Sequence, residues 1–183
     1  MTIEAGPQEL FTTLANERDV ANIVTLVNSA YRGTASRRGW TSEEHLIEGT
    51  RTGAESILEL LNAPGSVILL MRGQSALNAC VHLKKEAGDT AYLGMLSVRP
   101  AMQGSLFGRH LLAAAERYAR QHLGARTIEL TVIDVREELI AWYERRGYVR
   151  TGELRPFPYG DTRLGKPTRD DLRFVVLRRE LPG

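Results

Sequence analysis

The stretch LGMLSVRPAMQGSLFGRHLL at residues 93–112 decides how the chain folds. It runs from an apolar strand into Pro100, passes through a turn that contains Gly104, and then enters a helix. The first turn of a helix presents unpaired backbone N–H groups and the positive end of the helix dipole, which together suit a phosphate. Arg99 and Arg109 add positive charge at the edge of this turn. The local pattern therefore predicts either a phosphate-binding turn or an ordinary connection between a strand and a helix.

Hydrophobic patterns on both sides of this stretch predict a sheet covered by helices. The expected strands lie at residues 10–14, 67–71, 77–84, 90–98, 127–133, 148–153 and 172–180, and the expected helices at 20–30, 54–63, 106–122 and 136–146. The order strand, helix, strand between residues 90 and 133 predicts one parallel pair, because a helical crossover joins parallel neighbours. The runs at residues 67–71, 77–84 and 90–98 should form an antiparallel meander.

Two polar segments, residues 31–52 and 153–171, interrupt this regular order. In the first, Thr41-Ser42-Glu43-Glu44 has the pattern of a capping box and predicts a short helix. The second is unusually long for a compact domain, where such loops are commonly functional or disordered. We therefore expect binding residues in these segments.

The composition fits a globular domain in a reducing compartment. The chain has 183 residues, of which 43% are hydrophobic and 25% charged, and we expect a single domain over residues 1–183. A net charge of +2 without a basic stripe argues against nucleic-acid binding. Cys80 is the only cysteine, so no intrachain disulfide can form. The apolar runs are too short to span a membrane and no leader pattern is present, so a cytoplasmic location is expected.

At residues 103–108 the sequence resembles the GNAT superfamily of N-acetyltransferases. The family's coenzyme motif is Gln or Arg, two residues, Gly, one residue, then Gly or Ala, and here it reads Gln103-Gly104-Ser105-Leu106-Phe107-Gly108. The preceding Leu96-Ser97-Val98-Arg99-Pro100 looks like the end of the family's strand. The resemblance implies a mixed, mostly antiparallel central sheet of six to seven strands, with a parallel pair at the centre and about four flanking helices. It also implies that acetyl-CoA is bound by Leu96, Ser97, Val98, Gln103, Gly104, Ser105, Leu106, Phe107, Gly108 and Arg109.

Leu106 departs from this motif, which usually has Gly at that position. A leucine keeps its backbone N–H but is restricted to negative φ, so pyrophosphate binding requires residue 106 to be helical already. We expect that it is.

A second match covers VREELIAWYERRGY at residues 135–148, which is similar to the family's carboxy-terminal helix. Tyr143 falls on the family's catalytic tyrosine, whose phenol can protonate the leaving thiolate when it lies near the sulfur. The alternative is a tyrosine packed on the sheet for structural reasons. Arg136 stands where the family frequently has Asn. An arginine there could approach a phosphate, but we expect it to be a solvated charge on the first turn of the helix.

The resemblance implies that the acceptor is bound by the loop after the first helix and the loop between the last two strands. The candidate residues are Tyr31, Trp40, Phe157, Tyr159, Asp161 and Arg163. They suit an acceptor with an amine, which Asp161 could orient, and an arginine could also hold a carboxylate. The aromatic residues could equally pin the two loops to the surface.

A general base is not evident, because the strand before the coenzyme turn carries no carboxylate. The candidates are Glu129, Asp134, His82 and His110, each of which also has an ordinary structural explanation. A chain of water molecules could remove the proton instead.

The resemblance thus implies an enzyme, without a metal, that transfers an acetyl group from acetyl-CoA to a primary amine of a small molecule or peptide. The amine would attack directly in a ternary complex, and Cys80, in an apolar strand, would take no part. The alternative is a catalytically weak or inactive CoA-binding or regulatory module, motivated by Leu106 and the missing strand carboxylate. A nucleotide-binding domain is disfavoured because the turn lacks the Lys-Ser/Thr ending of a P-loop. An edge strand could pair in a homodimer.

Overall fold

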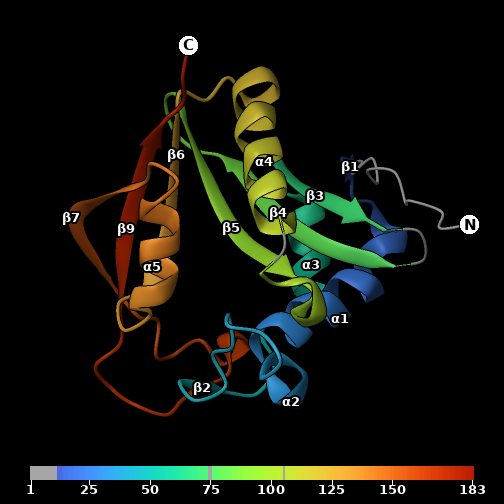
Figure 1. The fold of residues 1–183 in the computed structure, drawn as a ribbon, viewed down its shortest axis with the longest axis vertical. Coiled ribbons are helices and arrows are strands. Elements are labelled where there is room, and N and C mark those ends of the chain that lie inside the picture. Colours follow the sequence, from blue (N-terminus) through green and yellow to red (C-terminus); the bar gives the residue numbers. More distant parts are fainter. Residues whose placement is uncertain (1–11, 74–75, 105) are drawn as a thin grey trace, which may run out of the picture.

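The computed structural model describes residues 12–73, 76–104 and 106–183. Its main feature is a seven-stranded sheet with the order β1-β3-β4-β5-β6-β9-β7 (Figure 1). The strands are β1 (Thr12–Leu14), β3 (Ser66–Arg72), β4 (Leu77–Lys85), β5 (Thr90–Val98), β6 (Thr127–Ile133), β7 (Val149–Pro156) and β9 (Arg173–Glu180). A separate two-stranded sheet pairs β2 (Ile47–Glu48) with β8 (Lys166–Pro167).

One pair of neighbours in the main sheet, β5 and β6, is parallel, and the other neighbours are antiparallel. Helix α4 (Phe107–Leu123) makes the crossover between these two strands, as the alternation of patterns predicted. The predicted mixed, mostly antiparallel sheet with a central parallel pair is therefore confirmed.

Helices cover both faces of the sheet. Helices α4 and α5 (Glu137–Glu144) pack on one face, and α1 (Val20–Tyr31) and α3 (Ala54–Asn62) pack on the other (Figure 1). Strand β3 shows how the sequence builds both layers, because Leu69 and Met71 join the core under α4 whereas Ile68 and Leu70 join the core under α1. Alternate residues of a strand point to opposite faces, which explains this division.

The predicted helix after Thr41 is wrong. Residues in this segment form turns that lead into β2, and a short helix, α2 (Gly33–Ser36), lies earlier. The Thr41 hydroxyl donates to the carbonyl of Ala30 instead of capping a helix, and the Glu43 side chain bonds to two arginines. Tertiary contacts thus prevail over the local capping pattern. The described residues also include three single-turn 3-10 helices: η1 (Glu17–Asp19), η2 (Pro100–Met102) and η3 (Thr162–Leu164).

Pairing of β2 with β8 brings the two polar segments together below the main sheet (Figure 1). Thr168 strengthens this contact, since its N–H donates to the carbonyl of Leu46. No helix within the described ranges is both long and apolar enough to cross a bilayer.

Candidate active site

The two central strands separate part way along their length. Their ladder runs from Thr90, opposite Thr127, to Tyr92, opposite Glu129, where the pairing of β5 with β6 ends. Strand β5 also carries a bulge, where the register with β4 shifts and Met95 takes a φ of 54°. Figure 1 shows β5 and β6 diverging below the paired part. A cavity lies on each side of this divergence.

The first cavity, which we call the loop cavity, has a volume of 590 Å³ and lies between the start of α4 and helix α5. Of the residues expected to bind the coenzyme, seven line it: Leu96, Val98, Gln103, Gly104, Leu106, Gly108 and Arg109. Arg145 and Arg146 of the helix end add positive charge to the same cavity.

The other three expected coenzyme residues differ in their placement. Ser97 is buried and its hydroxyl donates to the carbonyl of Met95, and Phe107 packs against the core under α4. Neither lines the loop cavity. Ser105 lies outside the described residues.

Leu106 has the helical geometry that the departure from the motif requires, with φ −77° and ψ −3° at the position before α4. Leu106 is 54% exposed, so its side chain points to solvent and does not cover the backbone N–H groups of the turn. Gly108 is restricted for a different reason, because a Cβ there would lie 3.4 Å from the Trp142 ring. Glycine therefore keeps the wall of the loop cavity open at this point.

Gln103 connects the turn to the loop after α2. Its Oε1 accepts from the N–H of Trp40 at 2.8 Å, and its Nε2 donates to the Thr41 hydroxyl at 2.8 Å and to the carbonyl of Val98 at 3.0 Å. One side chain thus holds together the end of β5, the glycine turn and the loop at Trp40.

Tyr143 lies where the two cavities meet. It is 5% exposed and, together with Tyr31, Leu96 and Leu139, lines both cavities. Its ring packs edge-on against Trp142, and its hydroxyl forms no hydrogen bond with the described residues. Burial raises the pKa of Tyr143 above the ordinary phenol value, so its hydroxyl keeps its proton at neutral pH.

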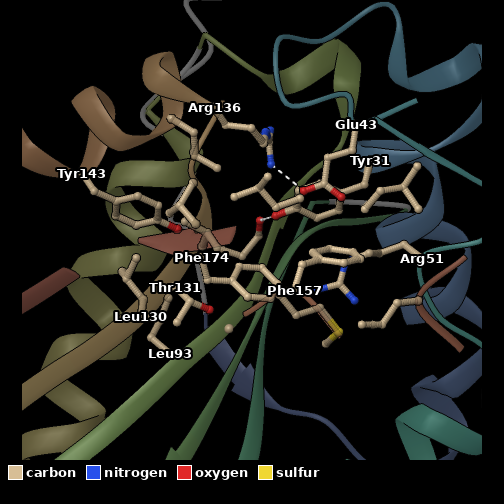
Figure 2. Close-up of a pocket in the computed structure, with 18 of the residues that line it drawn as sticks. Tyr31, Glu43, Arg51, Leu93, Leu130, Thr131, Arg136, Tyr143, Phe157 and Phe174 are labelled. Atoms are coloured by element: carbon tan, nitrogen blue, oxygen red, sulfur yellow. Dashed lines mark hydrogen bonds and ion pairs between the residues drawn. The ribbon is translucent and has the colours of Figure 1, made fainter. Parts of the chain in front are cut away.

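The second cavity, the sheet cavity, has a volume of 270 Å³ and lies between the diverging strands and the two polar segments. Glu43 is fixed on its wall between two guanidinium groups, at 2.7 Å from Arg136 and 3.3 Å from Arg32. All three side chains are at most 8% exposed. Figure 2 shows the ion pair between Glu43 and Arg136.

This geometry corrects the expectation for Arg136, which is a buried residue of the sheet cavity and not a solvated charge. Besides Glu43, it donates to the carbonyl of Thr41 at 2.7 Å. Sequence reasoning also missed Glu43 and Arg51 as cavity residues. The polar character of residues 31–52 was the available signal, but the capping pattern at Thr41 concealed it.

Tyr31 lines the sheet cavity between Arg51 and Arg136. Its hydroxyl donates to the carbonyl of Leu96, and the guanidinium groups of Arg51 and Arg136 lie 5.9 and 5.8 Å from its ring centroid. Burial raises the pKa of Tyr31 to about 12, so the phenol is neutral in the cavity.

The residues expected to bind the acceptor do not lie in one cavity. Tyr31 and Phe157 line the sheet cavity, whereas Trp40 lines the loop cavity and lies near Trp142. The other three are in neither cavity. The Tyr159 hydroxyl accepts from the N–H of Leu172, and Asp161 and Arg163 form an exposed ion pair with each other, which is a short-range contact within the loop.

None of the four candidate bases lines either cavity. Burial raises the pKa of Glu129, but hydrogen bonds from Arg178 and Arg155 outweigh it and leave that pKa lowered. Asp134 pairs with Arg173, and His110 is exposed on α4. His82 is buried against the Ser66 hydroxyl.

Cys80 is fully buried, and burial raises the pKa of its thiol to about 12. It lies in neither cavity, and no group of metal-ligating side chains is found within the described ranges.

The sequence matches the family model of the acetyltransferase (GNAT) family over residues 25–148. The chain therefore belongs to the GNAT family of acetyltransferases. The match contains the glycine turn, Tyr143 and the whole α4 crossover.

Solved structures show the same fold. A protein assigned as a phosphinothricin N-acetyltransferase is 20% identical, with a TM-score of 0.70 over 96% of this chain and 100% of the other. The yncA protein of Salmonella typhimurium, assigned as an acetyltransferase and solved with its cofactor acetyl-CoA, is 18% identical, with a TM-score of 0.69 over 96% of each chain. A chimera of spermidine N-acetyltransferase SpeG from Vibrio cholerae is 18% identical, with a TM-score of 0.67 over 95% of this chain and 96% of the other. No significantly similar sequence is found among curated proteins.

Proposed function

We propose that this enzyme transfers the acetyl group of acetyl-CoA to the primary amine of a small acceptor bound in the sheet cavity. The observation that carries the proposal is that the loop cavity and the sheet cavity meet at Tyr143, between the diverging ends of β5 and β6. A donor in one cavity and an acceptor in the other can therefore reach each other without a covalent enzyme intermediate.

The residues of the loop cavity fit acetyl-CoA. The turn at Gly104 and the helical N–H groups from Leu106 onward are suited to a pyrophosphate, and Arg109, Arg145 and Arg146 offer positive charge to further phosphate. Acetyl-CoA supplies a thioester whose carbonyl carbon is open to attack by an amine. The yncA neighbour, solved with acetyl-CoA, supports this choice of co-substrate.

In the proposed reaction the amine nitrogen forms a bond to the thioester carbonyl carbon and the carbon–sulfur bond breaks. Tyr143 donates its hydroxyl proton to the departing sulfur, and its raised pKa ensures that the phenol is protonated before the transfer. The proton lost by the amine leaves through water in the sheet cavity and restores the phenol. The products are the amide and free CoA thiol. Cys80 is buried outside both cavities, which supports direct attack.

Tyr143→Phe tests this role because it removes only the hydroxyl. Thiol release with an amine substrate should fall by roughly a hundredfold or more in kcat, since acid catalysis contributes about 10²–10⁴-fold. Acetyl-CoA affinity measured by calorimetry should remain nearly unchanged. Tyr118→Phe is the matched control, because Tyr118 lies on α4 and lines neither cavity. Unchanged kcat in the Tyr143 variant would exclude the acid role.

The alternative is a binding module without turnover, and it is motivated by the fact that none of the four candidate bases lines either cavity. Calorimetry and thiol release together separate the two functions. Tight binding of acetyl-CoA with no turnover on any amine would favour the module, whereas turnover on one amine would exclude it.

A further inference from the structure

The sheet cavity contains more positive than negative charge. Its ionisable lining consists of three guanidinium groups, from Arg32, Arg51 and Arg136, and one carboxylate, from Glu43. Both oxygens of Glu43 already accept hydrogen bonds, one from Arg32 and one from Arg136. No carboxylate of the described lining therefore remains to bind a second ammonium group of an acceptor.

The tyrosines of the cavity do not supply the missing negative charge. Burial raises the pKa of Tyr31 to about 12 and raises the pKa of Tyr143 as well, so both are neutral near pH 7. Glu129, on the neighbouring strand, lies outside the lining and pairs with Arg155 and Arg178. The excess positive charge is thus a property of the cavity itself.

Arg51 is the guanidinium group without a partner. Its head lies 5.9 Å from the Tyr31 ring centroid and forms no ion pair or hydrogen bond with the described residues. The backbone at this position is fixed, because the Asn28 Oδ1 accepts from the N–H groups of Arg51 and Thr52 at 2.7 and 3.1 Å. In Figure 2, Arg51 enters the cavity from the right and Tyr143 lies at the left.

Arg32 adds a second positive charge to the same wall, and its donors are only partly paired. Its Nε is buried and has no hydrogen-bond partner, although its other nitrogens donate to Glu43 and to the carbonyl of Leu164. A buried charged donor without a partner is costly, so another guanidinium charge in this cavity favours an anion over a cation. Phe157, Phe174 and Leu130 add apolar surface to the cavity, and Tyr92 and Thr131 add hydroxyl groups that bond to each other.

We propose that the acceptor carries an anionic oxyacid group beside its primary amine, and that Arg51 binds this group. The acceptor is then a small amino acid with an apolar side chain, whose carboxylate or phosphonate meets the guanidinium groups while its amine faces Tyr143. This inference rests on the proposed acetyl transfer. The proposal disfavours polyamines as acceptors. Their second ammonium group would lie among guanidinium groups, with no free carboxylate to bind it.

The substrate test compares molecules that differ in the anionic group alone. Leucine, methionine and phenylalanine are each assayed for thiol release beside the amide, the decarboxylated amine and the phosphonate of the same skeleton, with spermidine as the polycation. Rates are divided by the unprotonated fraction of each free amine at the assay pH. The acids should exceed the amides and decarboxylated amines roughly tenfold or more in kcat/KM, as a charge-assisted hydrogen bond implies. Preference for the carboxylate or the phosphonate then identifies the oxyacid.

The variants assign this preference to Arg51. In Arg51→Gln the KM for the acids should rise roughly tenfold, whereas Arg51→Lys should recover part of the loss. Neither change should alter the affinity for acetyl-CoA. Arg163→Gln is the control, since Arg163 is an arginine of the neighbouring loop that lines neither cavity.

Equilibrium binding of the same compounds, measured by calorimetry, keeps this inference separate from the proposed function. Turnover of amides or spermidine at rates equal to the acids would overturn the anionic acceptor while leaving acetyl transfer intact. Binding of an acid that Arg51→Gln weakens, with no turnover of any amine, would support the anion site and overturn acetyl transfer. If no acid binds and none is acetylated, the inference is wrong.

Discussion

The ion-pair cluster around Glu43 should be necessary for the stability of the fold. Glu43→Gln keeps the size of the side chain but removes its charge, and leaves Arg32 and Arg136 buried without a counter-charge. The amide oxygen can still accept from one arginine, but the amide NH₂ then faces the donors of the other.

The size of the effect follows from burial. Because the three side chains are at most 8% exposed, water screens them little, and breaking such a pair costs about 3–5 kcal/mol. For a chain of this length each kcal/mol lowers Tm by about 2–4 °C, so we expect a decrease of roughly 6–20 °C.

Thermal unfolding followed by circular dichroism measures this decrease, with denaturant unfolding as a second measure. The control is Glu44→Gln, whose partner Arg37 has a side chain 69% exposed, and its Tm should be nearly unchanged because water screens that pair. If Glu43→Gln unfolds within about 2 °C of the unaltered protein, a span worth about 1 kcal/mol or less, the cluster does not stabilise the fold as its burial implies.

Three further predictions concern pH, the glycine turn and the loop at Trp40. Burial, followed by the charge of Lys84, lowers the pKa of His82 to about 4. Its unfolded form gains a proton below about pH 6.5 while the folded form does not, so up to about 3 kcal/mol of stability is lost between pH 6.5 and 4. In denaturant titrations His82→Gln should lack this loss, and persistence of the full loss would assign it to other groups. Gly108→Asp should weaken acetyl-CoA binding in calorimetry by crowding Trp142 and repelling phosphate, and undiminished affinity would place the coenzyme elsewhere. Gln103→Ala should speed hydrogen exchange at the Trp40 amide, which loses its acceptor; equal exchange rates would show that other contacts hold this loop.

The parts of the fold that local periodicity encodes could be predicted. The crossover from β5 through α4 to β6 follows from alternating and helical patterns within about 40 residues. The helical geometry of Leu106 was also predictable, because a branched side chain excludes the positive φ that glycine permits. These features depend on neighbours in the chain.

The charged wall of the sheet cavity could not be predicted in this way. Glu43 and Arg136 are separated by 93 positions and meet only after the sheet has formed. Arg136 at a helix start has the local pattern of a solvated charge, and only tertiary packing buries it. Asp161 and Arg163, which were expected to contact the acceptor, pair with each other two positions apart and line neither cavity.

The excess positive charge of the sheet cavity bears on the missing base. A positive charge near an amine disfavours the protonated form, so a cavity with three guanidinium groups and one carboxylate should lower the pKa of a bound amine. One carboxylate on the acceptor leaves one positive charge in excess, and the amine can then lose its proton to water without a dedicated carboxylate. We infer that the arginines make a carboxylate base on the strand unnecessary, because they lower the pKa of the bound amine and water can then accept its proton. The kcat of an amino acid should therefore rise with pH at a lower apparent pKa than that of the free amine. Arg51→Gln should move that rise toward higher pH, and identical profiles for both proteins would require a base outside the charges described.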